Sequence, residues 1–221
     1  MSRPRPRSGF HAVLFDLDGT LIDSIGLIVD SYHHTLRTHG LPAKDDAYWL
    51  SGIGTPLREQ LKEWAHDPDL FEGLVNTYRE YNHANHDLRV TAYPGVPEML
   101  DELRVGEVGM AVVTSKMRRG AERGLKLVGL LEYVDVLICA DDVSMPKPDP
   151  EPVLQALSAL GVEPADTAFV GDSVHDMMAG RAAGVATAAA LWGPFDRQAL
   201  ELSQPTYWLD RPADLVTLAG R

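Results

Sequence analysis

The stretch that decides the fold reads HAVLFDLDGT and spans residues 11–20. It begins as an apolar run and ends in acids, as a buried strand does where it leaves the edge of a parallel sheet. Asp16 and Asp18 stand two positions apart, and such positions share one face of a strand, so the two carboxylates are expected to lie close together. Such a pair repels unless a cation or a shared proton holds it. A solubilising strand end or an Asp-Gly hairpin turn would be the alternative interpretation.

In the next segment, residues 24–92, apolar residues recur at helical spacing, and no stretch has the pattern of a strand. Thr55-Pro56 is typical of a helix start and predicts a helix running through Trp64. Two further stripes of residues recur at helical spacing, and the first ends at Gly40: Leu27, Ile28, Tyr32, Thr35 and Leu36, then Phe71, Leu74, Val75 and Tyr78.

After residue 93 the chain alternates strands with helices of roughly 10–15 residues, a pattern that predicts crossover units and a parallel sheet. Strands are expected at 108–115, 134–140, 167–171, 186–191 and 207–209, with helices around 97–103, 118–128, 151–160 and 174–183. Right-handed crossovers place helices on both faces of such a sheet. We therefore expect an α/β fold with three parts: a flexible basic tail at 1–9, a core at 10–23 and 93–221, and an all-helical cap inserted at 24–92.

Composition narrows the class of protein. The 221 residues carry 20 Lys and Arg against 32 Asp and Glu, a net charge of −12 that disfavours nucleic-acid and anionic membrane partners. The single cysteine, Cys139, excludes an internal disulfide framework and multi-cysteine metal sites. Neither a targeting segment nor a stretch long enough to span a bilayer is visible, so a cytoplasmic location is expected.

Polar residues follow several predicted strands, at the edge where ligands bind in open parallel sheets. Asp172 ends one strand, and Asp176 lies four residues later in GDSVHD, about one helical turn away. Together with Asp16 and Asp18 they predict a metal site, and oxygen ligands without thiolates favour Mg²⁺. Simple helix capping by the acids is the alternative.

Two further features lie at the same edge. Lys147 stands between prolines in MPKPDP, which hold its backbone on a defined path, although a free surface lysine is equally compatible. Thr114 and Ser115 end another strand, where hydroxyl and N–H groups can hold an anion or cap a helix.

Taken in order, FDLDGT, a strand ending in TS, KP and GDSxxD resemble the four motifs of the haloacid dehalogenase-like hydrolase superfamily, over essentially the whole chain. The helical insert is similar to that of the subfamily with a type-one cap, and the resemblance implies a Rossmann-like core. Within the superfamily, GIGTPLREQL (52–61), YPGV, VVTSK and KPDPEPV are similar both to phosphoglycolate phosphatases and to a related bacterial pyrophosphatase.

This resemblance implies a role for each motif residue. Asp16 would be the nucleophile that forms an aspartyl-phosphate, and Asp18 would protonate the leaving oxygen and then activate water. Thr114, with Ser115 beside it, would bind the phosphoryl group, and Lys147 would neutralise charge between that group and the nucleophile. Asp16, Asp18 through its backbone carbonyl, and Asp172 would hold Mg²⁺ with support from Asp176. The true dehalogenases of the superfamily lack the second aspartate, so Asp18 favours phosphoryl transfer.

The cap of such enzymes contacts the part of the substrate that does not react. Gly52 lies in the stretch that resembles the family's substrate-facing loop, and Arg58 follows in the first turn of the next helix, where a bound anion would offset its unfavourable position. Lys116 is a further candidate for substrate contact. The histidines at 33, 34, 39, 83, 86 and 175 are interpreted as solvated or packed side chains.

The expected function is a Mg²⁺-dependent phosphatase for a small anionic phosphomonoester, with 2-phosphoglycolate as the first substrate. Hydrolysis of inorganic pyrophosphate and a sugar phosphomutase are the alternatives on the same scaffold, and a non-catalytic module is disfavoured by the intact motifs. The expected partner is a small phosphorylated metabolite, with no nucleic acid or membrane. Monomer and homodimer both stay open.

Overall fold

The computed structural model describes residues 9–219, so the predicted tail lies outside the described residues except for its last position. A six-stranded sheet forms the core, with the order β5-β4-β1-β6-β7-β8 and parallel pairing between neighbours. The strands are β1 (Ala12–Phe15), β4 (Gly109–Val113), β5 (Val136–Ile138), β6 (Thr167–Gly171), β7 (Ala186–Ala190) and β8 (Tyr207–Leu209). The predicted α/β class with a parallel sheet is therefore confirmed.

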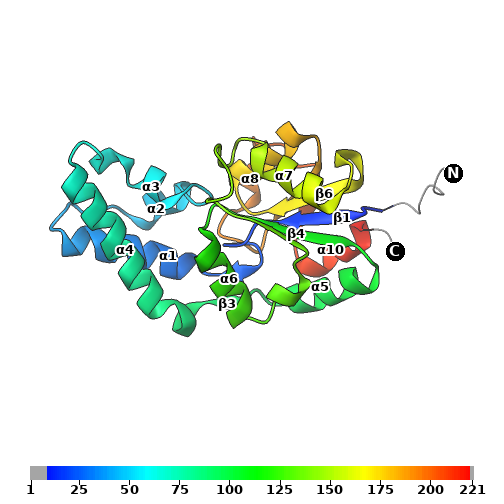
Figure 1. Cartoon of the computed structure of the whole chain (residues 1–221), viewed down its shortest axis with the longest axis horizontal. Coiled ribbons are helices and arrows are strands. Elements are labelled where there is room, and N and C mark those ends of the chain that lie inside the picture. The colour runs from blue at the N-terminus through cyan, green and yellow to red at the C-terminus, as the bar shows by residue number, and fades with distance from the viewer. Residues whose placement is uncertain (1–8, 220–221) are drawn as a thin grey trace.

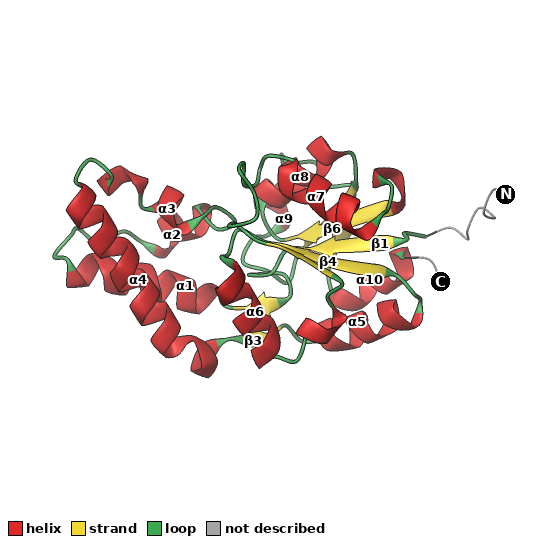
Figure 2. Ribbon diagram, in the orientation of Figure 1, coloured by secondary structure: helices red, strands yellow, loops and turns green. Residues whose placement is uncertain are grey.

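Helices cover both faces of this sheet, because its strands are apolar on both sides. On one face Phe15 and Val112 pack with residues of α5 (Val96–Val105), α6 (Arg118–Leu127) and α10 (Pro212–Leu218). On the other face Leu14 and Val113 pack with residues of α7 (Glu151–Leu160) and α8 (Val174–Ala183). Figure 2 shows these two helical layers above and below the strands. The remaining core helices are α9 (Arg197–Glu201), η2 (Leu131–Tyr133) and η3 (Pro164–Asp166).

The cap segment, residues 24–92, lies beyond the carboxyl ends of the strands (Figure 1). It contains α1 (Ile25–Thr38), α2 (Asp46–Ser51), α3 (Leu57–Gln60), η1 (Lys62–Trp64) and α4 (Pro68–Arg89). Most of its buried apolar side chains form a cluster of their own, in which Trp49 stacks on Tyr32 with ring centroids 4.2 Å apart. Leu27 and Val90 instead belong to a cluster of the sheet core. The segment begins and ends at a small antiparallel ribbon of β2 (Ile22–Asp23) and β3 (Thr91–Ala92).

The structure differs from the sequence expectation chiefly in short elements. The helix predicted from Thr55 to Trp64 is divided into α3 and η1, because Trp64 N–H donates to the Leu61 carbonyl in a tighter turn that buries both side chains. Helices α2, α9 and α10 and strands β2 and β3 were not expected, since they are too short to show periodicity. Within residues 9–219, none of the helices has the length and apolar character needed to cross a membrane.

Candidate active site

Three adjacent strands carry the candidate residues at their carboxyl ends. Asp16 directly follows β1, Thr114 follows β4 and Asp172 follows β6, and β1 pairs in register with both neighbours. Lys147 comes from the connection between β5 and α7, and Asp176 from the first turn of α8. Segments far apart in the sequence therefore meet at the sheet edge that faces the cap segment (Figure 1).

At this edge the structure forms a buried cluster of Asp16, Lys147, Asp172 and Asp176, each at most 3% exposed. The Lys147 ammonium donates to Asp16 Oδ1 at 2.7 Å, to Asp176 Oδ1 at 2.6 Å and to the Val113 carbonyl at 3.2 Å. All three of its donors are thus engaged, which fixes the ammonium against the Asp16 carboxylate.

Hydrogen bonds from Ser173 and Thr20 hold the two carboxylates of the second acidic motif. The Oδ2 atom of Asp176 accepts from the Ser173 backbone N–H at 3.0 Å and from the Ser173 hydroxyl at 2.6 Å, a capping box that starts α8. Asp172 Oδ1 accepts from the Thr20 hydroxyl at 2.7 Å. The capping interpretation of Asp176 is therefore correct, and the same side chain also belongs to the buried cluster.

Burial dominates the electrostatics of the cluster. Loss of water raises the pKa of Asp16 from its ordinary 3.8 to about 7, although Lys147 opposes the shift. Burial, with repulsion from Asp16 and Asp176, also raises the pKa of Asp172 well above its ordinary value. Burial disfavours the Lys147 ammonium, but attraction to Asp16 and Asp176 outweighs it and raises the pKa of Lys147. When all four groups are ionised, the three carboxylates and one ammonium leave an excess of negative charge in a buried site.

This cluster fits a divalent cation. Oxygens of Asp16, Asp172 and Asp176 lie within 4.8 Å of one another, the spacing of ligands around one metal ion. Asp172 Oδ2 is buried and has no hydrogen-bond partner within residues 9–219, so it is free to coordinate. Room for this carboxylate depends on Gly19, which has φ of +94° and where a Cβ would lie 2.5 Å from Asp172 Oδ2. Hard carboxylate oxygens suit Mg²⁺.

Above the cluster lies a pocket of about 890 Å³ between the sheet edge and the cap segment. Asp16, Asp18 and Thr114 reach its wall from the core, while Ile53, Gly54 and Tyr78 come from the cap segment. The pocket also holds five basic side chains, which is a concentration of positive charge in a chain of net charge −12. They are Arg58, Arg79, Lys116, Arg119 and Arg123.

Comparison with known proteins identifies the family. Residues 13–190 match the model of the family described as haloacid dehalogenase-like hydrolase. The chain belongs to this family. It is therefore an enzyme, a hydrolase of the phosphatase type, as the four motifs predicted.

Relatives of this hydrolase carry two kinds of name. The pyrophosphatase PpaX of Bacillus velezensis is 42% identical over 211 residues, covering 95% of this chain and 96% of that protein. PpaX of Halalkalibacterium halodurans is 41% identical over 212 residues, covering 95% and 97%. A solved structure from Haemophilus somnus, described as a predicted phosphoglycolate phosphatase, is 26% identical with a TM-score of 0.86 and coverages of 94% and 97%.

In this hydrolase, Asp18 has partners that the sequence did not predict. Its Oδ1 accepts from the Ser24 hydroxyl at 2.5 Å, and both of its carboxylate oxygens accept from the Lys116 ammonium at 2.7 and 2.9 Å. The side chains of Lys116 and Asp18 are 18% and 16% exposed, so this ion pair is largely shielded from water. The VVTSK motif was the available signal for Lys116, but it did not name Asp18 as its partner.

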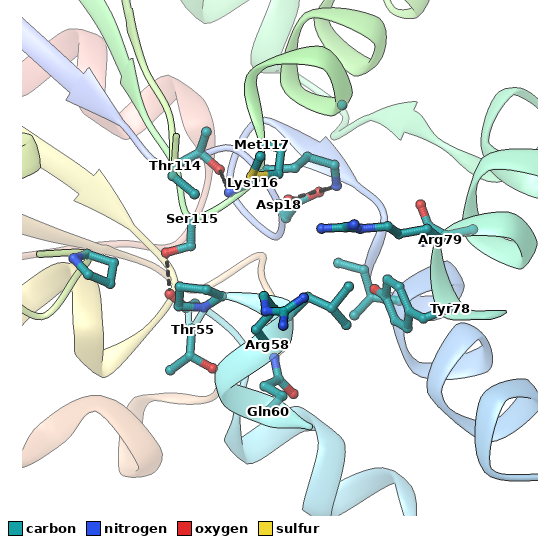
Figure 3. A pocket seen from close by; sticks show the side chains of 18 of the residues that line it. Asp18, Thr55, Arg58, Gln60, Tyr78, Arg79, Thr114, Ser115, Lys116 and Met117 are labelled. Carbon is teal, nitrogen blue, oxygen red and sulfur yellow. Dashed lines mark hydrogen bonds and ion pairs between the residues drawn. The ribbon is translucent and has the colours of Figure 1, made fainter. Parts of the chain in front are cut away.

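The cap segment meets the motifs through the loop at residues 52–55. The Ser115 hydroxyl donates to the Gly54 carbonyl at 2.6 Å, so this side chain is engaged with the cap segment (Figure 3). Gly54 has φ of +94°, and a Cβ there would lie 2.8 Å from Ser173 Oγ. A Cβ at Gly52, which is predicted to bind substrate, would lie 2.6 Å from Gln60 Oε1, while Gly54 lines the pocket. The role of Gly52 stays a prediction.

Arg58 lines the pocket, but its guanidinium is already occupied. It forms a two-pronged ion pair with Glu72, with distances of 2.5 and 3.2 Å, and stacks over the Phe71 ring at 4.6 Å. Thr114, which is 5% exposed, accepts a hydrogen bond from the Lys116 backbone N–H at 3.1 Å through its hydroxyl. Its predicted contact with a phosphoryl group and that of Arg58 with an anion stay predictions.

Proposed function

We propose that this protein is a Mg²⁺-dependent phosphatase that hydrolyses inorganic pyrophosphate. The observation that carries the proposal is the buried cluster of Asp16, Lys147, Asp172 and Asp176 beneath a pocket lined by five basic side chains. Relatives named pyrophosphatase at 37–42% identity over nearly the whole chain favour pyrophosphate over the other anionic substrates. The preference between the two substrates named from the sequence is therefore reversed.

The proposed chemistry has two steps that share one proton carrier. A carboxylate oxygen of Asp16 attacks phosphorus, the bridging P–O bond breaks, and the departing phosphate takes a proton from Asp18. Water then attacks the aspartyl-phosphate and gives a proton to Asp18, which releases the second phosphate and restores both carboxyl groups. Lys147 stays against Asp16 at 2.7 Å and offsets the repulsion between the nucleophile and the phosphate.

Asp16, Asp172 and the backbone carbonyl of Asp18 would hold Mg²⁺, with Asp176 in support. When bound, Mg²⁺ would supply positive charge that offsets the charge of the phosphoryl oxygens. The fit rests on the converging carboxylate oxygens and on the unpartnered Asp172 Oδ2 among the described residues. Thr114, at the end of β4, would donate its hydroxyl to the phosphoryl group.

2-Phosphoglycolate is the second candidate. Its support is the structural likeness to the Haemophilus somnus protein described as a predicted phosphoglycolate phosphatase. Its carboxylate would need the same positive charge near the phosphoryl site that a second phosphate needs. The leaving groups of the two substrates differ in charge and geometry, so comparing their turnover distinguishes the two candidate functions.

The deciding experiment is phosphate release by the full-length protein with Mg²⁺, comparing pyrophosphate and 2-phosphoglycolate at matched concentrations. We expect a higher kcat/KM for pyrophosphate. A preference for 2-phosphoglycolate would change the proposed substrate but leave the proposed two-step reaction unchanged. Turnover of neither substrate above the Asp16→Asn variant would overturn the proposal.

Asp16→Asn tests the nucleophile. An amide cannot form the acyl-phosphate as a carboxylate does, so we expect kcat to fall by about 1,000-fold or more while the fold is kept. Circular dichroism and Tm should match the wild type or show a small gain, because the change removes one buried charge of an unbalanced cluster. Near-native turnover would refute the role of Asp16.

A further inference from the structure

The geometry around Asp18 points to a binding site for the charged group that leaves. In the proposed reaction, on which this inference rests, Asp18 protonates the leaving oxygen, so the leaving group must lie beside the Asp18 carboxylate. Lys116 contacts that carboxylate directly, and Arg79 of α4 points across the pocket toward the same place (Figure 3). We propose that Lys116 and Arg79 bind the second anionic group of the substrate, and that this group takes Lys116 away from Asp18.

Arg79 is available for such a ligand. Among the described residues its guanidinium makes no hydrogen bond or ion pair within 4 Å, although it acts electrostatically on Glu72. Other basic side chains of the pocket are committed: Arg58 pairs with Glu72, and Arg123 pairs with Asp87 at 2.9 Å. Arg119 lines both this pocket and a second hollow between α4 and α6.

The ion pair between Lys116 and Asp18 is one that a diphosphate can replace. Within residues 9–219 the Lys116 ammonium donates only to the Asp18 carboxylate, which also accepts from the Ser24 hydroxyl. A phosphate group carries more charge and more acceptor oxygens than a carboxylate, so it competes well for an ammonium that both can reach. Once Lys116 turns to the phosphate, the Asp18 carboxylate keeps its contact with the Ser24 hydroxyl and faces the leaving group without the ammonium in between.

The position of Lys116 also suits this exchange. Thr114, the predicted phosphoryl ligand, stands two residues earlier, and its hydroxyl accepts from the Lys116 backbone N–H at 3.1 Å. Short local bonding therefore fixes the backbone of Lys116 beside the transferring group, while its long side chain can move. Arg79 approaches from the cap segment, so the second anionic group would lie between the core and the cap segment.

The test compares a charged and an uncharged leaving group. Pyrophosphate has the second anionic group, whereas p-nitrophenyl phosphate has an aromatic ring at that place. We expect Arg79→Met and Lys116→Met to lower kcat/KM for pyrophosphate by about 10- to 100-fold, the effect of one charge-assisted hydrogen bond. Arg79→Met should change kcat/KM for p-nitrophenyl phosphate by less than about 3-fold.

The Lys116→Met variant is tested with the same two substrates. Because p-nitrophenyl phosphate has no second anionic group for Lys116 to bind, we expect kcat/KM to fall more for pyrophosphate than for p-nitrophenyl phosphate. If Lys116 served only to position Asp18, the variant would lower turnover of both substrates equally. That result would overturn the inference and leave the proposed function standing.

Matched controls come from the same helices. Arg89→Met removes an arginine of α4 that pairs with Asp30 and does not line the pocket. Lys126→Met removes a lysine of α6 that pairs with Glu122 and is likewise outside the pocket. Both controls change the net charge as the test variants do, and both should leave the ratio of the two kcat/KM values unchanged.

A binding measurement decides the inference even without turnover. Calorimetry with methylenediphosphonate, a diphosphate that cannot be hydrolysed, is compared with inorganic phosphate in the presence of Mg²⁺. We expect Arg79→Met and Lys116→Met to weaken the diphosphonate by about 10- to 100-fold and phosphate by less than about 3-fold. Equal weakening of both ligands, or of neither, would refute the site even if the enzyme hydrolyses another substrate.

Discussion

At the scale of single residues, the buried carboxylates of the cluster work against the stability of the protein. Asp16, Asp172 and Asp176 are at most 3% exposed, and the Lys147 ammonium bonds to Asp16 and Asp176. Burying charge without full compensation costs free energy, so folded protein without a cation favours protonated carboxyl groups. The raised pKa of Asp16, about 7, expresses this cost.

This cost predicts how Mg²⁺ and pH together affect stability. Folding raises the pKa of Asp16 from 3.8 to about 7, so stability of the metal-free protein is lost as pH rises through that range. Mg²⁺ competes with the protons, and its stabilising effect should therefore grow with pH. At about 100 times its Kd, Mg²⁺ adds about 2.7 kcal/mol. That gain corresponds to about 5–10 °C in Tm at pH 8.

Thermal unfolding with Mg²⁺ or with EDTA at pH 5.5, 7 and 8 measures the effect. Asp172→Asn removes the unpartnered ligand and is the control that should abolish the dependence on Mg²⁺. The same rise in Tm at pH 5.5 and pH 8 would contradict the assignment of the cluster to a cation.

At the scale of elements, the loop at residues 52–55 joins the cap segment to two motifs. Ser115, after β4, donates to the Gly54 carbonyl, and Ser173, before α8, lies where a Gly54 side chain would be. The loop thus touches the strand end that carries Thr114 and the helix start that carries Asp176. Its position therefore fixes how closely the cap segment approaches the reacting groups.

Gly54→Ala should separate activity from stability. Alanine at a positive φ costs about 1–2 kcal/mol, and its Cβ would also lie 2.8 Å from Ser173 Oγ, which pushes the loop outward. A displacement of this kind should lower kcat/KM by about 10- to 100-fold. The control is Gly40→Ala, with φ of +64° and no atom within 4 Å of the added Cβ, which should lower Tm similarly and keep activity. Equal activity of the two variants would be evidence against this role of the loop.

At the scale of the whole molecule, two sets of apolar clusters hold the chain together. Leu74 and its neighbours in the cap segment form one, while Leu14 belongs to a cluster between the sheet and α7 and α8. The pocket lies between these two regions and is lined from both. The predicted domain boundaries at 24 and 92 imply that each region unfolds as its own unit.

Leu74→Ala and Leu14→Ala test this division. Both leucines are 0% exposed, so each change should cost about 2–5 kcal/mol in its own cluster. We expect calorimetric scans in which Leu74→Ala lowers one transition and Leu14→Ala the other. If each variant lowers a single shared transition, the cap segment and the core unfold together and the boundaries describe sequence order alone.

The sequence predicted the features that depend on periodicity and strand order. The alternation of strands and helices predicted a sheet whose carboxyl ends bring Asp16, Thr114 and Asp172 together, as observed. It did not predict the ion pair of Lys116 with Asp18, because that contact depends on how a long side chain turns across 98 positions of separation. Strand order gives the neighbourhood of a residue, whereas rotamer and packing choose its partner.

The ribbon of β2 and β3 has a consequence for how such enzymes diversify. Ile22 pairs with Ala92 and Asp23 with Thr91. The segment that leaves the core and the segment that returns to it therefore lie one strand spacing apart, about 4.8 Å. A gap that small can be closed by a tight turn or opened to receive another insert, while the order and register of the six core strands stay as they are. Recombination at this junction would exchange the cap segment and leave Asp16, Lys147 and Asp172 in place.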